Sequence, residues 1–265
     1  MGELLLKKVF WFAQANKYDL VYLTTYDSQV ALIDLLEFYG FKHTATKADG
    51  ELVYEKVFAR EKLAPIPGTS NFETDRLNYP RFIAGPDTRA FGVPIREAYH
   101  DTLYPDLRNP VQADLFDLAG MGVGPKRPGN TIRKVYLCRA QSTLGPPGSL
   151  LFFYKGKSKS PPSQAFTTIG LFEESSVATS TKDLMLLTGG RSVYSEAQLS
   201  EWEASPERPV KVINYLLAAY IEPAISLCEL QGIGIIGSHP PQSIFEIDRA
   251  SLDRLLQRLQ LGFSV

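Results

Sequence analysis

A run of basic residues is the strongest chemical signal in this sequence. Between positions 131 and 172 there are six lysines and arginines and no acidic residue, although the formal net charge of the chain is −1. Alternate residues of a strand share one face. A strand continued through Lys155, Lys157 and Lys159 would therefore present three ammonium groups, with Arg133 upstream adding to the basic surface. Phosphates attract such cations, and neighbouring rings stack on bases, so the pattern predicts nucleic-acid contact; the alternative is a solvated loop after a core strand.

Two loops offer further polar groups for a ligand. The segment GGRSVYSE (189–196) contains two glycines, followed by Arg191 and Tyr194. Glycines let the backbone approach a ligand closely. Its alternative interpretation is a glycine helix end with a tyrosine packed in the core. SHPPQS (238–243) offers Gln242 on a proline-rich loop, for which a simple turn is the alternative. We predict that Arg191, Tyr194 and Gln242 belong to the nucleic-acid site.

Metal and hydrolytic chemistry are not indicated. Cys138 and Cys228 are 90 residues apart and match no zinc motif, and the three histidines are scattered. His100 and Asp101 are neighbours on a predicted helix, where adjacent side chains point in different directions. We therefore expect no metal and no catalytic dyad, and the sequence contains no G-x-S-x-G elbow.

Length and hydropathy narrow the class of protein. A chain of 265 residues suits two domains. No stretch approaches the ~18 apolar residues of a membrane-spanning helix, and the first residues lack the features of a signal peptide. We expect a soluble cytoplasmic protein without membrane contact.

The first 58 residues predict a helix, a strand, a second helix and a hairpin. The first helix, over 2–15, is amphipathic, and its apolar face of Leu5, Val9 and Phe12 is expected in the core. The remaining elements are a strand over 19–26, a helix over 29–41, and a hairpin over 41–58 that turns at Gly50. Three strands with two helices leave an exposed edge at 19–26.

The rest of the chain is predicted to be rich in strands. Residues 60–129 contain a proline-rich linker, a strand over 89–95 and a short helix over 96–107. Further strands are predicted over 132–140, 149–156, 165–173 and from 209 onward, with helices over 181–190, 195–202 and 250–262. Short helices interleaved with about five strands favour a small, partly open barrel.

Three N-terminal motifs carry a family resemblance. Gly2-Glu3-Leu4-Leu5, DLVYLTT (19–25) and EFYGF (37–41) resemble the GNAT N-acetyltransferase fold from its central helix onward. The resemblance implies acetyl-CoA as cofactor, with Gly2 as the last glycine of the phosphate-binding loop at a helix N-terminus. The preceding strands of the family are missing, and Leu36 stands where its usual tyrosine is found. The resemblance therefore implies acetyl transfer that is lost or depends on missing sequence.

The C-terminal region resembles the PUA-like superfamily, of the ASCH or EVE kind. The motifs are PGSLLFFYKG (147–156), AFTTIGLFEE (165–174) and QSIFEID (242–248). This resemblance implies RNA or modified nucleic acid as the partner.

The combined prediction is an α/β (α+β) chain. A truncated GNAT-like mixed sheet with two helices (1–59) precedes a linker or elaboration (60–129) and a PUA-like small barrel (130–265). The expected function is that of a GNAT-related protein fused to a nucleic-acid-binding domain. Two alternatives stay open: an active N-acetyltransferase whose sheet edge is completed by a second copy or a partner chain, and a regulatory interaction module without catalysis.

Overall fold

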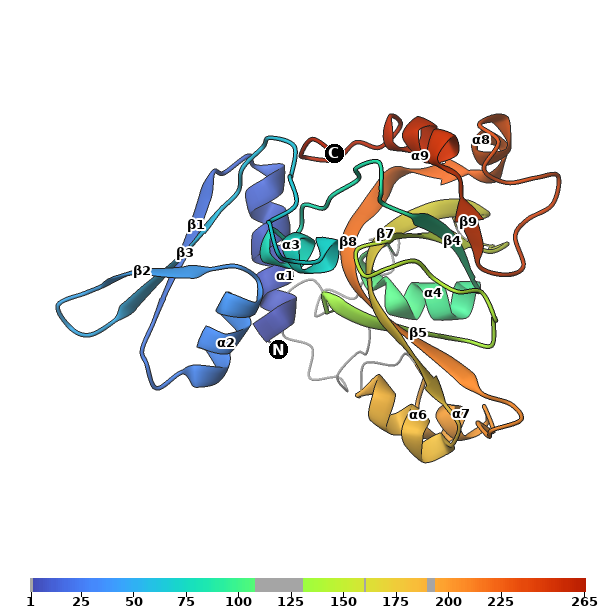
Figure 1. Cartoon of the computed structure of the whole chain (residues 1–265), viewed down its shortest axis with the longest axis horizontal. Coiled ribbons are helices and arrows are strands. Elements are labelled where there is room, and N and C mark those ends of the chain that lie inside the picture. The colour runs from blue at the N-terminus through green and yellow to red at the C-terminus, as the bar shows by residue number, and fades with distance from the viewer. Residues whose placement is uncertain (1, 108–130, 160, 190–193) are drawn as a thin grey trace.

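Two β-sheets lie on either side of the N-terminal helix α1 (Gly2–Ala15), as Figure 1 shows. The structure is a computed structural model that describes residues 2–107, 131–159, 161–189 and 194–265. Its two sheets and several short helices confirm the predicted α+β class. Within these described ranges, no helix has the length and apolar character needed to cross a membrane.

The smaller sheet is formed by the N-terminal segment, in the order β1-β3-β2. Its elements are β1 (Leu20–Thr25), α2 (Val30–Phe38), β2 (Lys42–Thr46) and β3 (Leu52–Val57). Gly50, with a φ of 85°, closes the predicted hairpin between β2 and β3. Both strand pairs are antiparallel, which corrects the mixed sheet predicted from resemblance. The reason is that β3 turns back from β2 and pairs with β1 along its other side.

The larger sheet has the order β5-β8-β7-β6-β4-β9 and is open. Its strands are β4 (Ala90–Ile95), β5 (Arg133–Cys138), β6 (Leu150–Lys155), β7 (Ala165–Ala178), β8 (Val210–Ser226) and β9 (Phe245–Ile247). Only β4 and β6 pair in parallel among these neighbours. Every residue of β6 is buried, because elements cover both faces of the sheet there. Register shifts along β7 and β8 bend these long strands.

Short helices surround this sheet. They are α3 (Asn71–Leu77), α4 (Glu97–Leu103), the 3-10 helix η1 (Pro105–Leu107), α6 (Thr181–Thr188), α7 (Glu196–Ser200), α8 (Leu227–Gly232) and α9 (Arg249–Leu256). Serine N-caps precede four of them: the side chains of Ser70, Ser180, Ser195 and Ser226 each accept a hydrogen bond from the backbone N–H three residues later. Such caps fix where each helix starts, because they satisfy an otherwise unpaired donor.

The apolar core continues from the smaller sheet into the larger one. Phe10 of α1 is fully buried and lies 6.0 Å from the ring of Phe58 and 5.6 Å from that of Tyr79. The Tyr79 hydroxyl in turn donates to the backbone oxygen of Leu217 in β8, at 2.6 Å. Helix α1 is therefore packed against both sheets.

The predicted linker contributes to this fold. Residues 90–95 form β4, which lies between β6 and β9 in the larger sheet. The predicted boundary at residue 130 thus separates β4 from the strands that it pairs with. Helix α3 lies within the proline-rich stretch that was predicted to be a linker. Residues 108–129 of this segment lie outside the described residues.

The buried face of α1 differs from the predicted one. Leu6, Phe10 and Ala13 are buried, whereas Leu5 and Phe12 are 65% and 62% exposed. Both sets follow the helical period, so the sequence pattern alone could not choose between them. The helix is apolar on two adjacent faces, and the second of these faces lies open in the described chain.

Candidate functional site

A pocket of about 870 Å³ opens at one end of the larger sheet. Its lining combines five aromatic residues with four basic ones: Tyr99, Tyr136, Tyr154, Tyr194, Trp202, Arg96, Arg139, Lys157 and Arg208. Glu201 is the acidic residue of the lining. The volume is in the range of small-molecule sites, roughly 300–1,000 Å³, and the side chains suit a ligand that is both planar and anionic.

Contacts between rings build one wall of the pocket. The ring of Tyr99, on α4, lies 4.6 Å from that of Tyr194, and Tyr194 meets Trp202 edge-on at 5.5 Å. Tyr136 of β5 donates its hydroxyl to the backbone oxygen of Pro94, at 2.9 Å. The aromatic wall is therefore assembled from three separate segments of the chain.

Local capping and an arginine hold Trp202 in this wall. Helix α7 begins with a capping box, in which the Ser195 side chain accepts from the backbone of Gln198 and the Gln198 side chain accepts from the backbone of Ser195. The loop that follows α7 is held by Arg139. The Arg139 guanidinium donates to the backbone oxygens of Trp202 and Arg208 and lies 5.7 Å from the Trp202 ring. Arg139 thus fixes the loop that carries two pocket residues.

The electrostatics of the pocket favour an anion. Burial raises the pKa values of Tyr136 and Tyr194, so that both phenols remain neutral at physiological pH. The lining therefore contains four cationic side chains and one carboxylate, that of Glu201. All four cations are exposed to solvent, but Arg139 bonds the Trp202 loop and Arg208 pairs with Glu203 at 2.5 Å. Arg96 and Lys157 can therefore meet a ligand most readily.

Three of the predicted site residues come together here. Lys157, Tyr194 and Gln242 all line the pocket, although they are far apart in the chain. Lys159 is exposed but is not among the lining residues, and Arg191 lies outside the described residues. Arg133 is elsewhere: its Nε donates to Glu3 of α1 at 2.8 Å, and its guanidinium packs on the Phe38 ring.

The prediction for Lys155 is corrected by its burial. Strand β6 ends at Lys155, whose side chain is 3% exposed and pairs with Asp101 at 3.0 Å. Lys157 and Lys159 follow in a loop, so the three lysines do not share a strand face. The Gly156 N–H still donates to the Ile95 oxygen of β4 at 3.0 Å, and the chain leaves the sheet after it.

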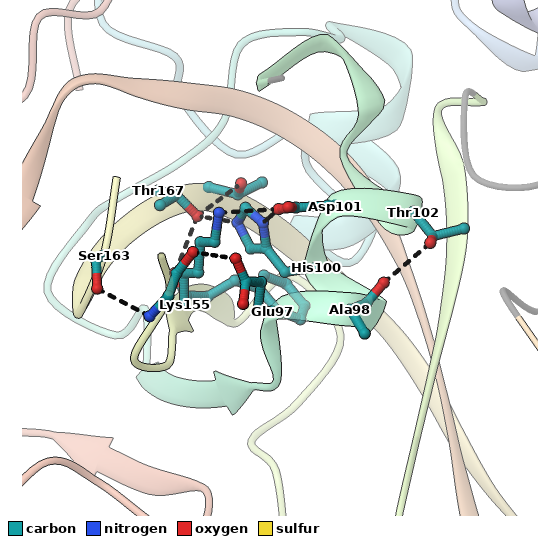
Figure 2. A network of polar contacts seen from close by, with 11 residues as sticks. Glu97, Ala98, His100, Asp101, Thr102, Lys155, Ser163 and Thr167 are labelled. Carbon is teal, nitrogen blue, oxygen red and sulfur yellow. Dashed lines mark hydrogen bonds and ion pairs between the residues drawn. The ribbon is translucent and has the colours of Figure 1, made fainter. Parts of the chain in front are cut away.

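Lys155 belongs to a polar network beside the pocket, shown in Figure 2. His100 Nδ1 lies 2.8 Å from Asp101 Oδ1, and His100 Nε2 lies 2.8 Å from the Thr167 hydroxyl. This contact corrects the expectation that adjacent helix residues could not meet, since the short Asp101 side chain reaches back to the ring. Burial lowers the pKa of His100, and it would raise that of Asp101, but hydrogen bonds from His100 and Lys155 bring the pKa of Asp101 to about 2.

The network has a structural role in this arrangement. Thr167 and His100 have no exposed surface, so the hydroxyl cannot reach a substrate. The chain of contacts instead ties α4 to β6 and β7. At its edge, the Ser158 hydroxyl donates to Glu97 of α4, and the Ser158 N–H donates to the Ser163 hydroxyl at 2.9 Å. These bonds hold the loop that presents Lys157.

The predicted cofactor residue Gly2 begins α1 and is not among the residues that line the pocket. A Cβ added at Gly2 would come within 2.9 Å of Leu35 Cδ2, so the glycine allows α1 to pack on α2. Nearby Tyr39 is fully buried and donates its hydroxyl to Glu3 at 2.6 Å. Neither contact favours a pyrophosphate site, and acetyl-CoA remains a prediction from resemblance alone.

No protein-family model matches the chain, and no curated protein matches it. Among solved structures, it is similar to ZmASCH, an ASCH protein from Zymomonas mobilis. One structure of it shares 14% identity with a TM-score of 0.44 over 65% of this chain and 96% of that one. A serine-to-alanine mutant gives 14% identity and a TM-score of 0.45 over 66% and 100%.

Several pocket residues could not be identified from the sequence. Arg96, Tyr99, Tyr136, Trp202 and Arg208 come from segments separated by up to about a hundred residues. The spacing of Arg96 and Tyr99, which puts a cation and a ring on one side of a helix start, was the local signal available. Only the fold brings these residues to one place.

Proposed function

We propose that this chain binds single-stranded nucleic acid, with RNA as the first candidate. The observation that carries the proposal is the pocket in which a wall of Tyr99, Tyr194 and Trp202 adjoins the cations Arg96 and Lys157. An unpaired base would stack against the rings while its flanking phosphates lie on the basic rim. Base–aromatic stacking contributes about 1–3 kcal/mol per base.

The charge distribution supports a local contact rather than a long binding track. The net charge of the chain is −1, so no overall field draws in a polyanion. Three basic side chains, Arg96, Lys157 and Arg208, stand around the pocket. If each neutralises one phosphate of a single strand, the slope of log K against log salt is about −2, from three contacts at about −0.7 each.

Polar side chains in the pocket could distinguish one base from another. Gln164 and Gln242 contribute amides to the lining, and an amide can donate to and accept from the edge of a base. Because the site is concave, it can enclose a base only when that base is unpaired. Acetyl transfer is not part of the proposal, because the packing of Gly2 and Tyr39 gives it no support.

Fluorescence anisotropy with a labelled single-stranded RNA tests this function. Titrations over a series of salt concentrations should give measurable binding at low salt and a slope near −2. Lys157→Ala should weaken binding and reduce the magnitude of the slope by about 0.7. Lys159→Ala is the matched control, since Lys159 is exposed in the same loop but does not line the pocket. Absence of binding at low salt would refute the proposal.

A further inference from the structure

The strand β1 has a free edge in the described structure, where β3 is its only partner. Asp19 and Phe58 flank the first pair of the ladder, Leu20 and Val57, and the N–H of Phe58 donates to the oxygen of Asp19 at 2.8 Å. Asp19 and Phe58 are therefore a hydrogen-bonded pair. Hydrogen-bonded and non-bonded pairs alternate along an antiparallel ladder. The backbone N–H and C=O groups of Leu20, Tyr22 and Thr24 therefore point away from β3, toward the open edge.

The other edge of this sheet is protected, whereas β1 is not. Strand β2 carries Lys42 and His43 and is interrupted by a register shift between His43 and Ala45. Charges and bulges are the usual devices that keep an edge strand from pairing. The sequence of β1, LVYLTT, contains no charge, no proline and no bulge. Its edge thus has the properties of a strand that pairs.

An apolar helix face lies beside this edge. The four-residue connection from α1 to β1 turns the chain back, so that helix and strand run in opposite directions, as Figure 1 shows. The exposed ring of Phe12 lies 6.0 Å from that of Tyr18, which precedes β1, and Leu5 is two helical turns away on the same face. The apolar face of a helix normally packs against another element.

The uncovered face of the sheet carries apolar side chains along β1, with Glu55 of β3 opposite Tyr22. Leu20 is paired across the strands with Val57, so both point to the same face, and Tyr22 follows two residues later on that face. These side chains are 44%, 68% and 65% exposed. A strand added to β1 would therefore meet apolar side chains on both of its faces.

We infer that β1 pairs with β1 of a second copy of this chain, antiparallel about a two-fold axis, to give one continuous six-stranded sheet. The outward groups define the register: Tyr22 lies opposite the second copy's Tyr22, and Leu20 lies opposite the second copy's Thr24. A second copy fits because the edge is uncharged and self-complementary, as an isologous contact requires. With a net charge of −1, two copies repel each other only weakly.

The exposed area is consistent with a stable contact. The rings of Phe12, Tyr18 and Tyr22 are 62%, 51% and 65% exposed. At about 200 Å² per aromatic side chain, they offer about 350 Å², nearly half of the roughly 800 Å² that each partner buries in a standard interface. Leu5, Leu20, Val57 and the strand backbone add to this area.

A cysteine placed on the axis tests the register. In a Cys228→Ala background, which removes the exposed native thiol, Tyr22→Cys should form an intermolecular disulfide under mild oxidation. The opposed Cα atoms would be about 5.5 Å apart, within the disulfide range of about 4.4–6.8 Å. Thr46→Cys, on the protected strand β2, is the matched control and should remain uncrosslinked. Equal crosslinking of both variants, or of neither, would overturn the inference.

Light scattering after size exclusion tests the contact itself. The unmodified chain should have the mass of two copies. Tyr22→Pro removes the outward N–H without touching the β3 ladder, and Phe12→Lys charges the helix face; each should weaken the dimer by about tenfold or more, because the axis repeats every substitution. Circular dichroism verifies that each variant is folded. A monomeric unmodified chain, or a dimer that both folded variants retain, would contradict the inference.

Discussion

Asp75 should make the stability of this protein fall as the pH rises. The residue is fully buried in α3: one carboxylate oxygen accepts the backbone N–H of Ile83 at 2.8 Å, and the other has no hydrogen-bond partner among the described residues. Burial raises the pKa of Asp75 to about 8, although the bond from Ile83 opposes this. Asp75→Asn keeps the shape and the accepting oxygen but cannot ionise.

The sign follows from proton linkage. A folded-state pKa above the unfolded value means that the folded protein holds the proton more tightly, so the stabilisation is complete below about pH 4 and is lost as pH rises toward 8. Between pH 5 and 7 the loss is about 2.7 kcal/mol, at about 1.36 kcal/mol per pH unit. The Asp75→Asn variant should therefore gain about that much stability relative to the unmodified chain over this interval.

Urea denaturation at several pH values measures the difference. Lys56 and His100 also titrate with lowered pKa values, because burial disfavours their charged forms, but they are present in both proteins and cancel when the two are subtracted. Asp34→Asn, an exposed substitution on α2, is the control for the removal of one carboxylate at the surface. Parallel stability curves for Asp75→Asn and the unmodified chain would show that Asp75 ionises normally and refute the reasoning.

Three other substitutions probe the site and its supports. Gly92→Ala would place a Cβ 2.2 Å from the Phe245 ring, so it should cost about 1–3 kcal/mol and lower the melting temperature. Arg139→Gln should free the loop of Trp202, weakening RNA binding and increasing iodide quenching of that tryptophan; unchanged quenching would contradict this role. Lys155→Met breaks a largely buried ion pair, so urea denaturation should show a loss of about 3–5 kcal/mol, with RNA affinity of the folded protein nearly unchanged.

The sequence predicted most elements because their patterns are local. The hairpin at Gly50 and the strand that became β6 follow from turn chemistry and apolar runs, and both are found. The face of α1 was wrong because Leu5 and Leu6 begin two equally regular apolar stripes. Which stripe is buried depends on where Tyr39, Phe58 and Tyr79 pack against Phe10, and this is not encoded in the spacing of α1.

The pocket was predictable only in part for a related reason. Lys157 stood out as part of a basic run, and Tyr194 and Gln242 stood out in glycine- and proline-rich loops; all three line the pocket. Their partners Tyr99 and Trp202 look like ordinary core aromatics in the sequence. The burial of Lys155 depends on Asp101 reaching it from α4, a contact between segments more than fifty residues apart, which no local pattern reveals.

The fluorescence of Trp202 offers the most direct test of nucleic-acid binding at this pocket. The chain has two tryptophans, and Trp11→Phe leaves Trp202 as the single reporter. Titration with a short single-stranded RNA should quench its emission as a base stacks on the aromatic wall, and Lys157→Ala should shift the titration to higher RNA concentration. Saturable RNA binding by anisotropy without any change in Trp202 emission would place the ligand elsewhere and contradict the proposed site.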